Sequence, residues 1–518
     1  MTHSAERLWN RAQNYLAEGQ IDAARIALES LVQKAPAHTD AHLYLGGIAW
    51  EEDRVRDSTR HALDASRELP DDATLICDVV GALLQAGEVV AARGCLDHPF
   101  LARSKDAHAL VRVASLRDKM REYPEALALL DRAAAVGADG PEFRFSRGMQ
   151  LAFNGRLKEA ESELEASLRM NRAGGRAALE LSRLHKQTPE KNHVEDIERR
   201  IRNVAQGTED HAALEFARYK ELEDLGRYDE AWKALETGNA IMYSRQKHDP
   251  DFARRLLEGL IAISTPEFLR PADVVHEGPQ PIFIVGMPRS GTTVLDRLLG
   301  NHSRVASVGE LDDFALQMRW ATNHRTTLDE EVLRRLANVD YAELGRRYLA
   351  QTQWRAEGTP FYIDKLPRNW MLAGLIRRAL PQAKILHLVR DPMDVCFSNF
   401  RALFAEAFAH IYNLDALASH YLQYRRVLDH WHKAMPGEIL DVPYDNLVRD
   451  PEATLRGVLE FCGLEWEPGV VDLTRNSAPV STLSAAQVRE PIHARAFEEW
   501  RRYEKQLAPL QKALGLDA

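Results

Sequence analysis

The sequence of 518 residues predicts two joined fold classes, an α-solenoid of helical repeats followed by an α/β domain with a mostly parallel sheet. Small residues recur every 34 positions in the first half of the chain. A proline-rich segment then interrupts the helical text, and an apolar strand, a glycine-containing loop and an amphipathic helix follow it. We therefore place the solenoid at residues 1–273, a linker at 274–281 and the α/β domain at 282–518.

The repeat is visible as small residues early in apolar-periodic stretches such as LKEAESELEASL. These residues are Ala24, Ser58, Ala92, Ala126 and Ala160. The pattern resembles the tetratricopeptide repeat, in which two antiparallel helices meet at small residues. The register breaks after about residue 172, in text that predicts one irregular helical pair, and returns weakly at Ala231 and Leu235. Repeat arrays are usually binding surfaces, so we expect this one to hold a partner.

Composition limits the classes of function. The formal net charge of −10 gives no overall electrostatic reason to bind nucleic acid, so any anionic ligand must find local positive charge. No segment approaches 18 uninterrupted apolar residues, and the first residues lack the pattern of a signal peptide. The four cysteines, Cys77, Cys95, Cys396 and Cys462, show no close pairing and are expected to be buried. We expect a soluble cytoplasmic protein without a membrane span.

A phosphate loop is predicted at the start of the α/β domain. The apolar run Ile282–Val285 leads into GMPRSGTT and then into the helical text VLDRLLGNH. Backbone N–H groups and the helix dipole converge on one concavity in such a strand–loop–helix unit. The candidate anion-binding residues are Arg289, Ser290, Gly291, Thr292 and Thr293. Thr292 stands where nucleoside triphosphatases have a lysine, which disfavours ATP or GTP chemistry and favours a single 5′-phosphate.

PRSGTT after a buried strand resembles the 5′-phosphosulfate loop of sulfotransferases, and most of all that of the protein-tyrosine sulfotransferases. The resemblance extends over about residues 281 to 505. It implies an α/β, P-loop-like sulfotransferase domain that uses 3′-phosphoadenosine 5′-phosphosulfate (PAPS) as sulfonate donor. It also implies 3′-phosphoadenosine 5′-phosphate as the product, and no metal.

A second anion site is predicted at VRDPMDVCFSNF. Arg390 ends an apolar strand and Ser398 lies on the next helix, so a guanidinium and a hydroxyl can meet on one anion. The family uses this pair for the 3′-phosphate of the donor. The alternative is an arginine that merely pairs with the neighbouring Asp391. By the same resemblance, Tyr444 in VPYDNL helps to hold the nucleotide.

The resemblance also supplies the catalytic candidates. It assigns Glu310 as the base that takes the acceptor's proton, Lys365 to the bridging oxygen of the phosphosulfate, and Ser484 to the leaving phosphate. Gln487 falls at matching spacing and is assigned to the donor. The structural alternatives are a solvated carboxylate and a surface lysine. Some sulfotransferases of small molecules use a histidine base, and His302 is kept as that reserve.

Two positions depart from the family's pattern. Its arginine four residues beyond the 3′-phosphate serine is Ala402 here, with Arg401 beside it, and its lysine before the late tryptophan is Glu499. Arg489 or Arg501 is our candidate for the missing charge.

The sequence thus predicts sulfonate transfer from PAPS to an acceptor hydroxyl, with a tyrosine of a peptide or protein held by the repeats as the suggested acceptor. A glycan, a lipid or a small phenol remains open as the acceptor. A P-loop kinase and a nucleotide-binding scaffold without catalysis are the alternatives from other classes. The missing P-loop lysine disfavours the kinase, and the presence of Glu310, Lys365 and Ser484 disfavours the scaffold.

Overall fold

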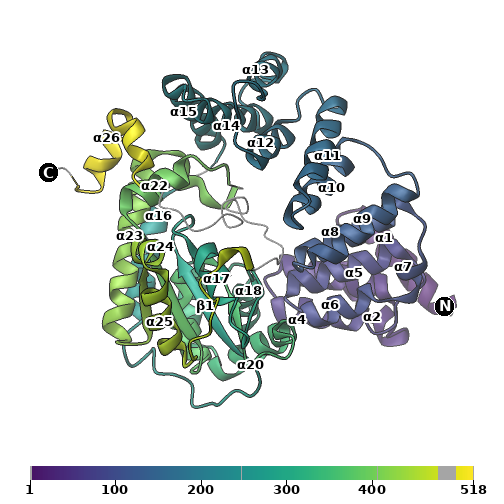
Figure 1. Cartoon of the computed structure of the whole chain (residues 1–518). Coiled ribbons are helices and arrows are strands. Elements are labelled where there is room, and N and C mark those ends of the chain that lie inside the picture. The colour runs from purple at the N-terminus through teal and green to yellow at the C-terminus, as the bar shows by residue number, and fades with distance from the viewer. Residues whose placement is uncertain (1–2, 247, 405, 476–496, 517–518) are drawn as a thin grey trace.

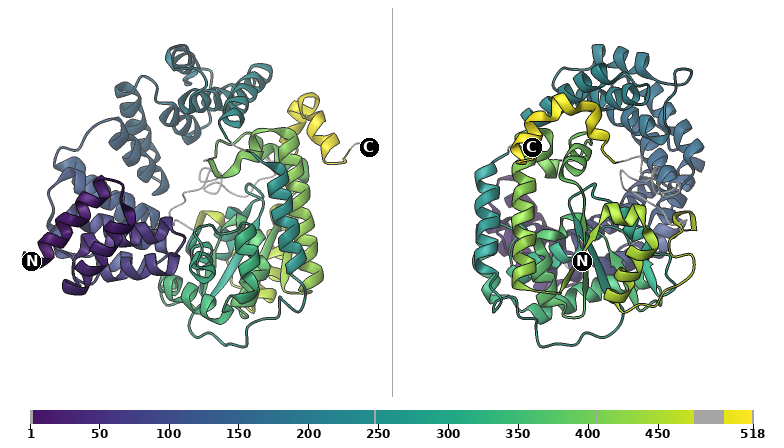
Figure 2. Two further views of the ribbon diagram at one scale, coloured as in Figure 1. Left: turned by 180° about the vertical axis from the view of Figure 1, so that it is seen from behind. Right: turned by 60° about the vertical axis from the view of Figure 1, so that its left-hand side comes forward.

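The computed structural model describes residues 3–246, 248–404, 406–475 and 497–516. A curved array of helices arches from one flank of an α/β domain to the other (Figures 1 and 2). None of the helices in these ranges is long and apolar enough to cross a bilayer.

The first part of the array consists of five helical hairpins, with one short extra helix, α7 (Pro99–Arg103), between the third and the fourth. The hairpins are α1 (His3–Ala17) with α2 (Ile21–Lys34), α3 (Thr39–Glu51) with α4 (Val55–Ala65), α5 (Ala73–Ala86) with α6 (Val89–Leu96), α8 (Ala107–Lys119) with α9 (Tyr123–Ala135), and α10 (Pro141–Phe153) with α11 (Leu157–Met170). The small residues of the 34-residue period all lie on the second helix of a hairpin. Four of them are fully buried alanines, and Ser58 is half-buried. They let the paired helices approach closely, which is the reason for the period.

The second part of the array is less regular. Its helices are α12 (Gly175–Leu184), α13 (Val194–Asn203), α14 (Glu209–Asp224), α15 (Tyr228–Arg245) and α16 (Pro250–Ile263). α12 and α13 form the irregular pair expected after residue 172, and Ala231 and Leu235 are buried on α15. α16 packs on α19 (Glu330–Arg335) and α23 (Leu414–Ala434), so this last predicted solenoid helix lies against the α/β domain.

A five-stranded parallel sheet forms the centre of the α/β domain, with strand order β2-β3-β1-β4-β5. Its strands are β1 (Gln280–Gly286), β2 (Val305–Ser307), β3 (Phe361–Asp364), β4 (Lys384–Val389) and β5 (Ile439–Pro443). β1 occupies the middle, begins slightly earlier than the predicted strand and is buried nearly throughout. The parallel arrangement confirms the fold class that the sequence predicts.

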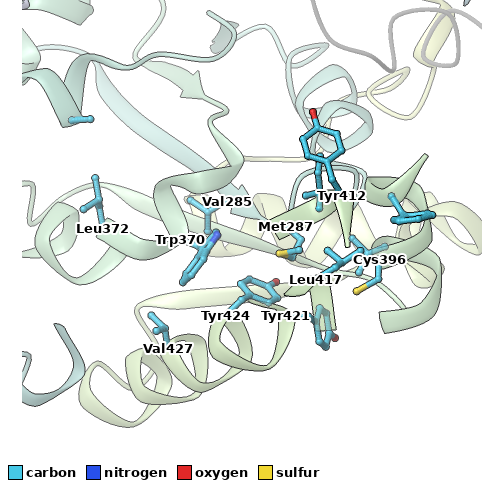
Figure 3. Packing of buried hydrophobic residues seen from close by; sticks show 14 of the residues in the cluster. Val285, Met287, Trp370, Leu372, Cys396, Tyr412, Leu417, Tyr421, Tyr424 and Val427 are labelled. Atoms are coloured by element: carbon cyan, nitrogen blue, oxygen red, sulfur yellow. The ribbon is translucent and has the colours of Figure 1, made fainter. Parts of the chain in front are cut away.

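Helices cover both faces of the sheet, as the unbroken apolar text of β1 requires. Ile282 and Ile284 face α17 (Thr292–Leu299) and α25 (Pro451–Cys462). Phe283 and Val285 belong to the core on the other face, where α23 carries Tyr424 and Val427 below Val285 (Figure 3). The remaining elements are α18 (Asp313–Thr322), α20 (Tyr341–Thr352), α21 (Ala373–Ala379), α22 (Pro392–Phe400), α24 (Tyr444–Arg449), α26 (Glu504–Ala513), and the 3₁₀ segments η1 (Leu336–Asn338), η2 (Gln353–Ala356), η3 (Pro367–Leu372), η4 (Glu406–Tyr412), η5 (Leu473–Arg475) and η8 (Glu499–Tyr503).

The array and the α/β domain share one hydrophobic core, which runs from α11 and α12 through α15 to the sheet. The Trp232 ring on α15 stacks on Phe400 at a centroid distance of 5.8 Å and lies 5.5 Å from Tyr503. Asn239 donates a hydrogen bond of 3.1 Å to the Phe400 carbonyl at the same contact. All four cysteines are buried and free, as predicted.

We expect Trp232→Ala to lower the free energy of unfolding by about 3 to 5 kcal/mol, because a large buried aromatic side chain is lost from the shared core. Denaturant unfolding followed by circular dichroism measures this change. The control is Tyr44→Ala, at a position that is 42% exposed, where the change should stay within about 0.5 kcal/mol. Equal effects of the two substitutions would contradict the shared core.

Candidate active site

The five strands of the sheet end at one edge, and each is followed by a residue or loop that the sequence marked. β1 leads into the phosphate loop at residues 287–291, and β2 leads towards Glu310. Lys365 directly follows β3, Arg390 follows β4, and Tyr444 follows β5. Carboxyl ends of parallel strands next to a central strand are the usual place of a ligand site in an open α/β sheet.

The phosphate loop takes a tight path between β1 and α17. Gly286, Arg289 and Gly291 have positive φ angles of 151°, 68° and 103°. A Cβ atom on Gly291 would overlap the ring of Tyr444, so only glycine fits at this position. The loop therefore turns the first N–H groups of α17 towards the sheet edge, the arrangement that binds phosphate.

Arg289 joins the two predicted anion sites. Its Nε donates to the Ser398 hydroxyl at 3.4 Å, and its carbonyl accepts a 2.9 Å hydrogen bond from Nη1 of Arg390. The guanidinium of Arg390 also lies over the Tyr444 ring, 4.8 Å from its centroid. The loop and the Arg390–Ser398 pair thus form one continuous polar surface.

Positive charge is concentrated at this surface. Burial, followed by the charges of Arg401, Arg390 and Arg183, lowers the pKa of Arg289 to about 9. Arg289 therefore stays protonated at neutral pH in a neighbourhood that disfavours its charge. An anion with several negative charges would relieve this repulsion, and Arg183 contributes to it from α12 of the solenoid.

Arg401 has carboxylate partners on two sides. Its guanidinium lies 2.6 Å from Glu499 and 3.7 Å from Glu223 on α14. Although burial lowers the pKa of Arg401, these two carboxylates raise it above the ordinary value. Glu499, which replaces the family's lysine, therefore forms an ion pair with Arg401, the neighbour of Ala402.

Glu310 and Lys365 come from separate motifs and are in direct contact. Lys365 Nζ lies 2.5 Å from Glu310 Oε1, with the lysine side chain buried and the glutamate side chain 31% exposed. A backbone hydrogen bond of 2.9 Å from Lys365 N to Gly309 O holds the two segments side by side. The pair offers an acid or base and a cation at the sheet edge.

Three of the predicted site residues, Ser484, Gln487 and Arg489, lie outside the described residues. Arg501, one candidate for the missing basic charge, donates to Glu498 at 2.9 Å and is half exposed.

His302, the reserve base, is a buried residue whose ring is held by backbone groups. Its Nε2 lies 2.9 Å from the Glu465 carbonyl, and its Nδ1 accepts a 3.1 Å hydrogen bond from the Arg304 amide. Both ring nitrogens are engaged, so this side chain is structural and is not placed to take an acceptor's proton.

Sequence reasoning missed the contribution of the solenoid to this site. Arg121, in the turn between α8 and α9, donates from Nε to the Glu310 carbonyl at 3.1 Å. Arg183 adds its charge near Arg289. Neither belongs to a motif of the α/β domain. The one signal in the sequence is an arginine at a repeat position where other repeats have glycine.

A cavity of about 460 Å³ opens between the solenoid and the segment that follows α22. Phe145, Phe153 and Glu180 line it from the solenoid, and Leu403 and Phe404 line it from the α/β domain. It combines aromatic walls with carboxylates and arginines, so it suits a ligand with both apolar and polar groups.

Residues 281–468 match the Sulfotransferase family. An uncharacterized protein of Aquifex aeolicus is 32% identical over 340 residues, which are 62% of this chain and 44% of that protein. The protein-tyrosine sulfotransferase of Drosophila melanogaster is 25% identical over 269 residues, which are 46% of this chain and 51% of that enzyme. This chain therefore spans about half the length of these relatives.

Two solved structures resemble parts of the chain. The sulfotransferase domain of the olefin synthase of Synechococcus PCC 7002 is 22% identical, with a TM-score of 0.33, over 48% of this chain and 99% of that one. A tetratricopeptide repeat protein of Parabacteroides merdae is 16% identical, with a TM-score of 0.34, over 46% of this chain and 93% of that one.

A phosphate loop after the central strand, with an arginine at the next strand end, defines an α/β domain of the P-loop-like class. Within that class, residues 281–468 match the sulfotransferase family. The helical hairpins that precede it recur with the 34-residue period that the sequence predicts. Both resemblances in the sequence are thereby confirmed.

We expect Gly291→Ala to abolish the rise in melting temperature that inorganic phosphate gives to the unmodified protein, because a side chain at this position displaces Tyr444 and the loop. Thermal melts with and without phosphate measure this. Gly358→Ala is the matched control, since Gly358 has a positive φ of 89° but open space around its Cβ position. A phosphate response that survives in Gly291→Ala would contradict a phosphate site in this loop.

Proposed function

We propose that this chain is a sulfotransferase that moves the sulfonate group of PAPS to a tyrosine hydroxyl of a polypeptide. The observation that carries the proposal is the sheet edge, where the phosphate loop contacts both Ser398 and Arg390, and where Lys365, paired with Glu310, follows the strand next to β1. The match to the sulfotransferase family supports the reaction class.

Two separate anion sites fit a donor that carries phosphate groups at the 5′ and the 3′ positions of its ribose. The loop and the start of α17 bind the 5′-phosphosulfate through backbone N–H groups, Ser290 and Thr293. Arg390 and Ser398 bind the 3′-phosphate, and Tyr444 packs beside the nucleoside. The three arginines that lower the pKa of Arg289 make the site complementary to a strongly anionic ligand.

The acid–lysine pair supplies the chemistry of transfer. PAPS, when bound, provides the electrophilic sulfonate group. Glu310 takes the proton of the acceptor hydroxyl, and Lys365 stabilises negative charge at the phosphate end of the breaking bond. Ser484 is assigned to the same phosphate by its sequence motif. The 2.5 Å contact between Lys365 and Glu310 keeps the buried lysine paired until ligands enter.

A kinase or a nucleoside triphosphatase is the rival reaction. Thr292 begins α17 where such enzymes have the lysine that contacts the β- and γ-phosphates. PAPS has no γ-phosphate, and its second phosphate group is at the 3′ position, so its binding does not require that lysine. The site chemistry therefore favours PAPS over ATP.

The cavity between the solenoid and Phe404 supports a polypeptide acceptor, because its aromatic walls and charged groups suit a peptide segment. The name of the Drosophila relative supports tyrosine as the acceptor residue. A glycan, a lipid or a small phenol is the alternative. Sulfur-labelled PAPS incubated with a cell lysate distinguishes them, since tyrosine sulfation leaves the label on protein and yields tyrosine O-sulfate after total hydrolysis in base.

We expect Arg390→Ala to weaken binding of 3′-phosphoadenosine 5′-phosphate by about 2 to 5 kcal/mol, by analogy with other truncated charge pairs. AMP lacks the 3′-phosphate, so its affinity should hardly change. Calorimetric titration with both ligands measures this difference. Arg456→Ala, an exposed arginine on α25, is the control and should alter neither affinity. If Arg390→Ala lowered the affinity for both ligands equally, Arg390 would not bind the 3′-phosphate.

We expect Glu310→Gln to keep donor binding and to lose sulfonate transfer by on the order of 10²- to 10⁴-fold, the usual contribution of a positioned base. Transfer of label from PAPS, with calorimetry of 3′-phosphoadenosine 5′-phosphate, separates rate from binding. Glu330→Gln on the exposed face of α19 is the control. Normal turnover by Glu310→Gln would place the base elsewhere.

A further inference from the structure

The turn inside each regular hairpin has the same backbone conformation. One residue of it, the first in the turn between α5 and α6 and the second in the other four turns, has a positive φ, a conformation that glycine adopts without strain and other residues rarely adopt. These residues recur every 34 positions and are Gly19 (φ 71°), Asp53 (φ 61°), Gly87 (φ 77°), Arg121 (φ 65°) and Gly155 (φ 80°). The fourth repeat therefore places a long, branched cation where three of the others have glycine.

Arg121 has this strained backbone conformation, and its side chain contacts the α/β domain. Its Nε donates to the Glu310 carbonyl at 3.1 Å, and its Nη1 lies 3.3 Å from the Tyr123 hydroxyl. Although burial lowers the pKa of Arg121, Tyr123 and the carboxylates of Glu310 and Asp312 raise it above the ordinary value. A non-glycine residue kept in a strained conformation is a recognised sign of a functional role.

A second residue of the α/β domain, Arg355, also contacts the turn that contains Arg121. The carbonyl of Met120 accepts a 2.8 Å hydrogen bond from Arg355, which follows α20. Glu122, on the other side of Arg121, is buried and holds Arg117 and Arg93 of the solenoid. The Arg121 backbone is thus held between the two parts of the protein, and its side chain has a defined direction.

Successive repeat turns contact the α/β domain in a regular register along α18 and its flanking residues. The contacts pair Asp53 with His324, Gly87 with Gln317, and Arg121 with Glu310. Each step of one repeat therefore corresponds to seven residues of the α/β domain. Of the three α/β residues only Gln317 lies on α18, and Glu310 and His324 lie just before and just after that helix. The row of contacts therefore extends along α18 and past both of its ends.

We propose that Arg121 is a positioning residue for Glu310, so that the solenoid is part of the catalytic site as well as a surface for the acceptor. The guanidinium of Arg121 fixes the backbone of Glu310 at one end of the row, and Asp53 contacts the other end, away from Glu310. Lys365 then meets the Glu310 carboxylate from the other side. This inference rests on the proposed function only where it calls Glu310 the base.

Arg121→Gly is the decisive variant, because it restores the residue that the repeat turn favours and should fold normally. We expect kcat to fall by about 10- to 100-fold, the usual loss when a supporting contact to a site residue is removed. KM for the acceptor and the affinity for 3′-phosphoadenosine 5′-phosphate should stay within about twofold of the unmodified full-length protein. Guanidinium ion added at millimolar concentration should restore part of kcat, and Arg121→Lys should lose less activity than Arg121→Gly.

Asp53→Gly is the matched control, since it makes the same change in the turn at the far end of the row. It should keep kcat and show no response to guanidinium. Amide hydrogen exchange gives a readout that needs no activity. Exchange at residues 308–312 should accelerate in Arg121→Gly, whereas exchange at residues 317–322 should not change.

The outcomes separate the two proposals. If the unmodified protein does not transfer sulfonate but exchange at residues 308–312 accelerates in Arg121→Gly, the positioning of Glu310 stands and the proposed function fails. If Arg121→Gly keeps kcat and its exchange pattern is that of the unmodified protein, the positioning role is wrong. A loss of kcat that guanidinium does not relieve, with unchanged exchange, would also overturn it.

Discussion

The parallel sheet imposes the constraint from which the site follows. All five strands run in one direction, so the residues after them meet at one edge although they are far apart in the chain. The central strand supplies the phosphate loop, and its two neighbours in the sheet supply Lys365 and Arg390. Tyr444, after the outermost strand, packs against Gly291 of the loop and so couples that end of the sheet to the anion site. A shift in the register of any one strand would separate groups that the proposed function brings to one ligand.

The solenoid cannot be treated as an independent module. Its core is continuous with that of the α/β domain through Trp232 and Phe400, and its turns follow α18 in register. The array therefore contacts the α/β domain at two separate places and arches between them (Figure 2). An insertion in one repeat would move every later turn along α18, and Arg121 would then miss Glu310.

Much of the fold was readable from the sequence because its signals are local. The 34-residue period lies in small residues that helix pairs need, and the phosphate loop lies in one continuous stretch with the strand before it. The contact between Lys365 and Glu310 was predictable only through family resemblance, since no local pattern relates the two motifs. The role of Arg121 and the packing of α16 on the α/β domain were not predictable. A period reveals that repeats exist, but not how far the array curves or what its ends contact. The PAPS donor, the tyrosine acceptor and the cytoplasmic location stay predictions.

The electrostatics of the site depend on both parts of the chain. The protein carries a net charge of −10, yet three arginines besides Arg289 influence the phosphate loop. One of them, Arg183, belongs to the solenoid, and another, Arg401, is partly balanced by Glu223 of the solenoid. The repeats therefore add positive charge near the phosphate loop through Arg183 and offset part of it through Glu223. Because charges in a partly buried site are screened weakly by solvent, a small movement of α12 or α14 changes the potential at Arg289. Occupation of the cavity that α12 helps to line would thus alter the electrostatic potential at the phosphate loop, which gives a physical route between these two places.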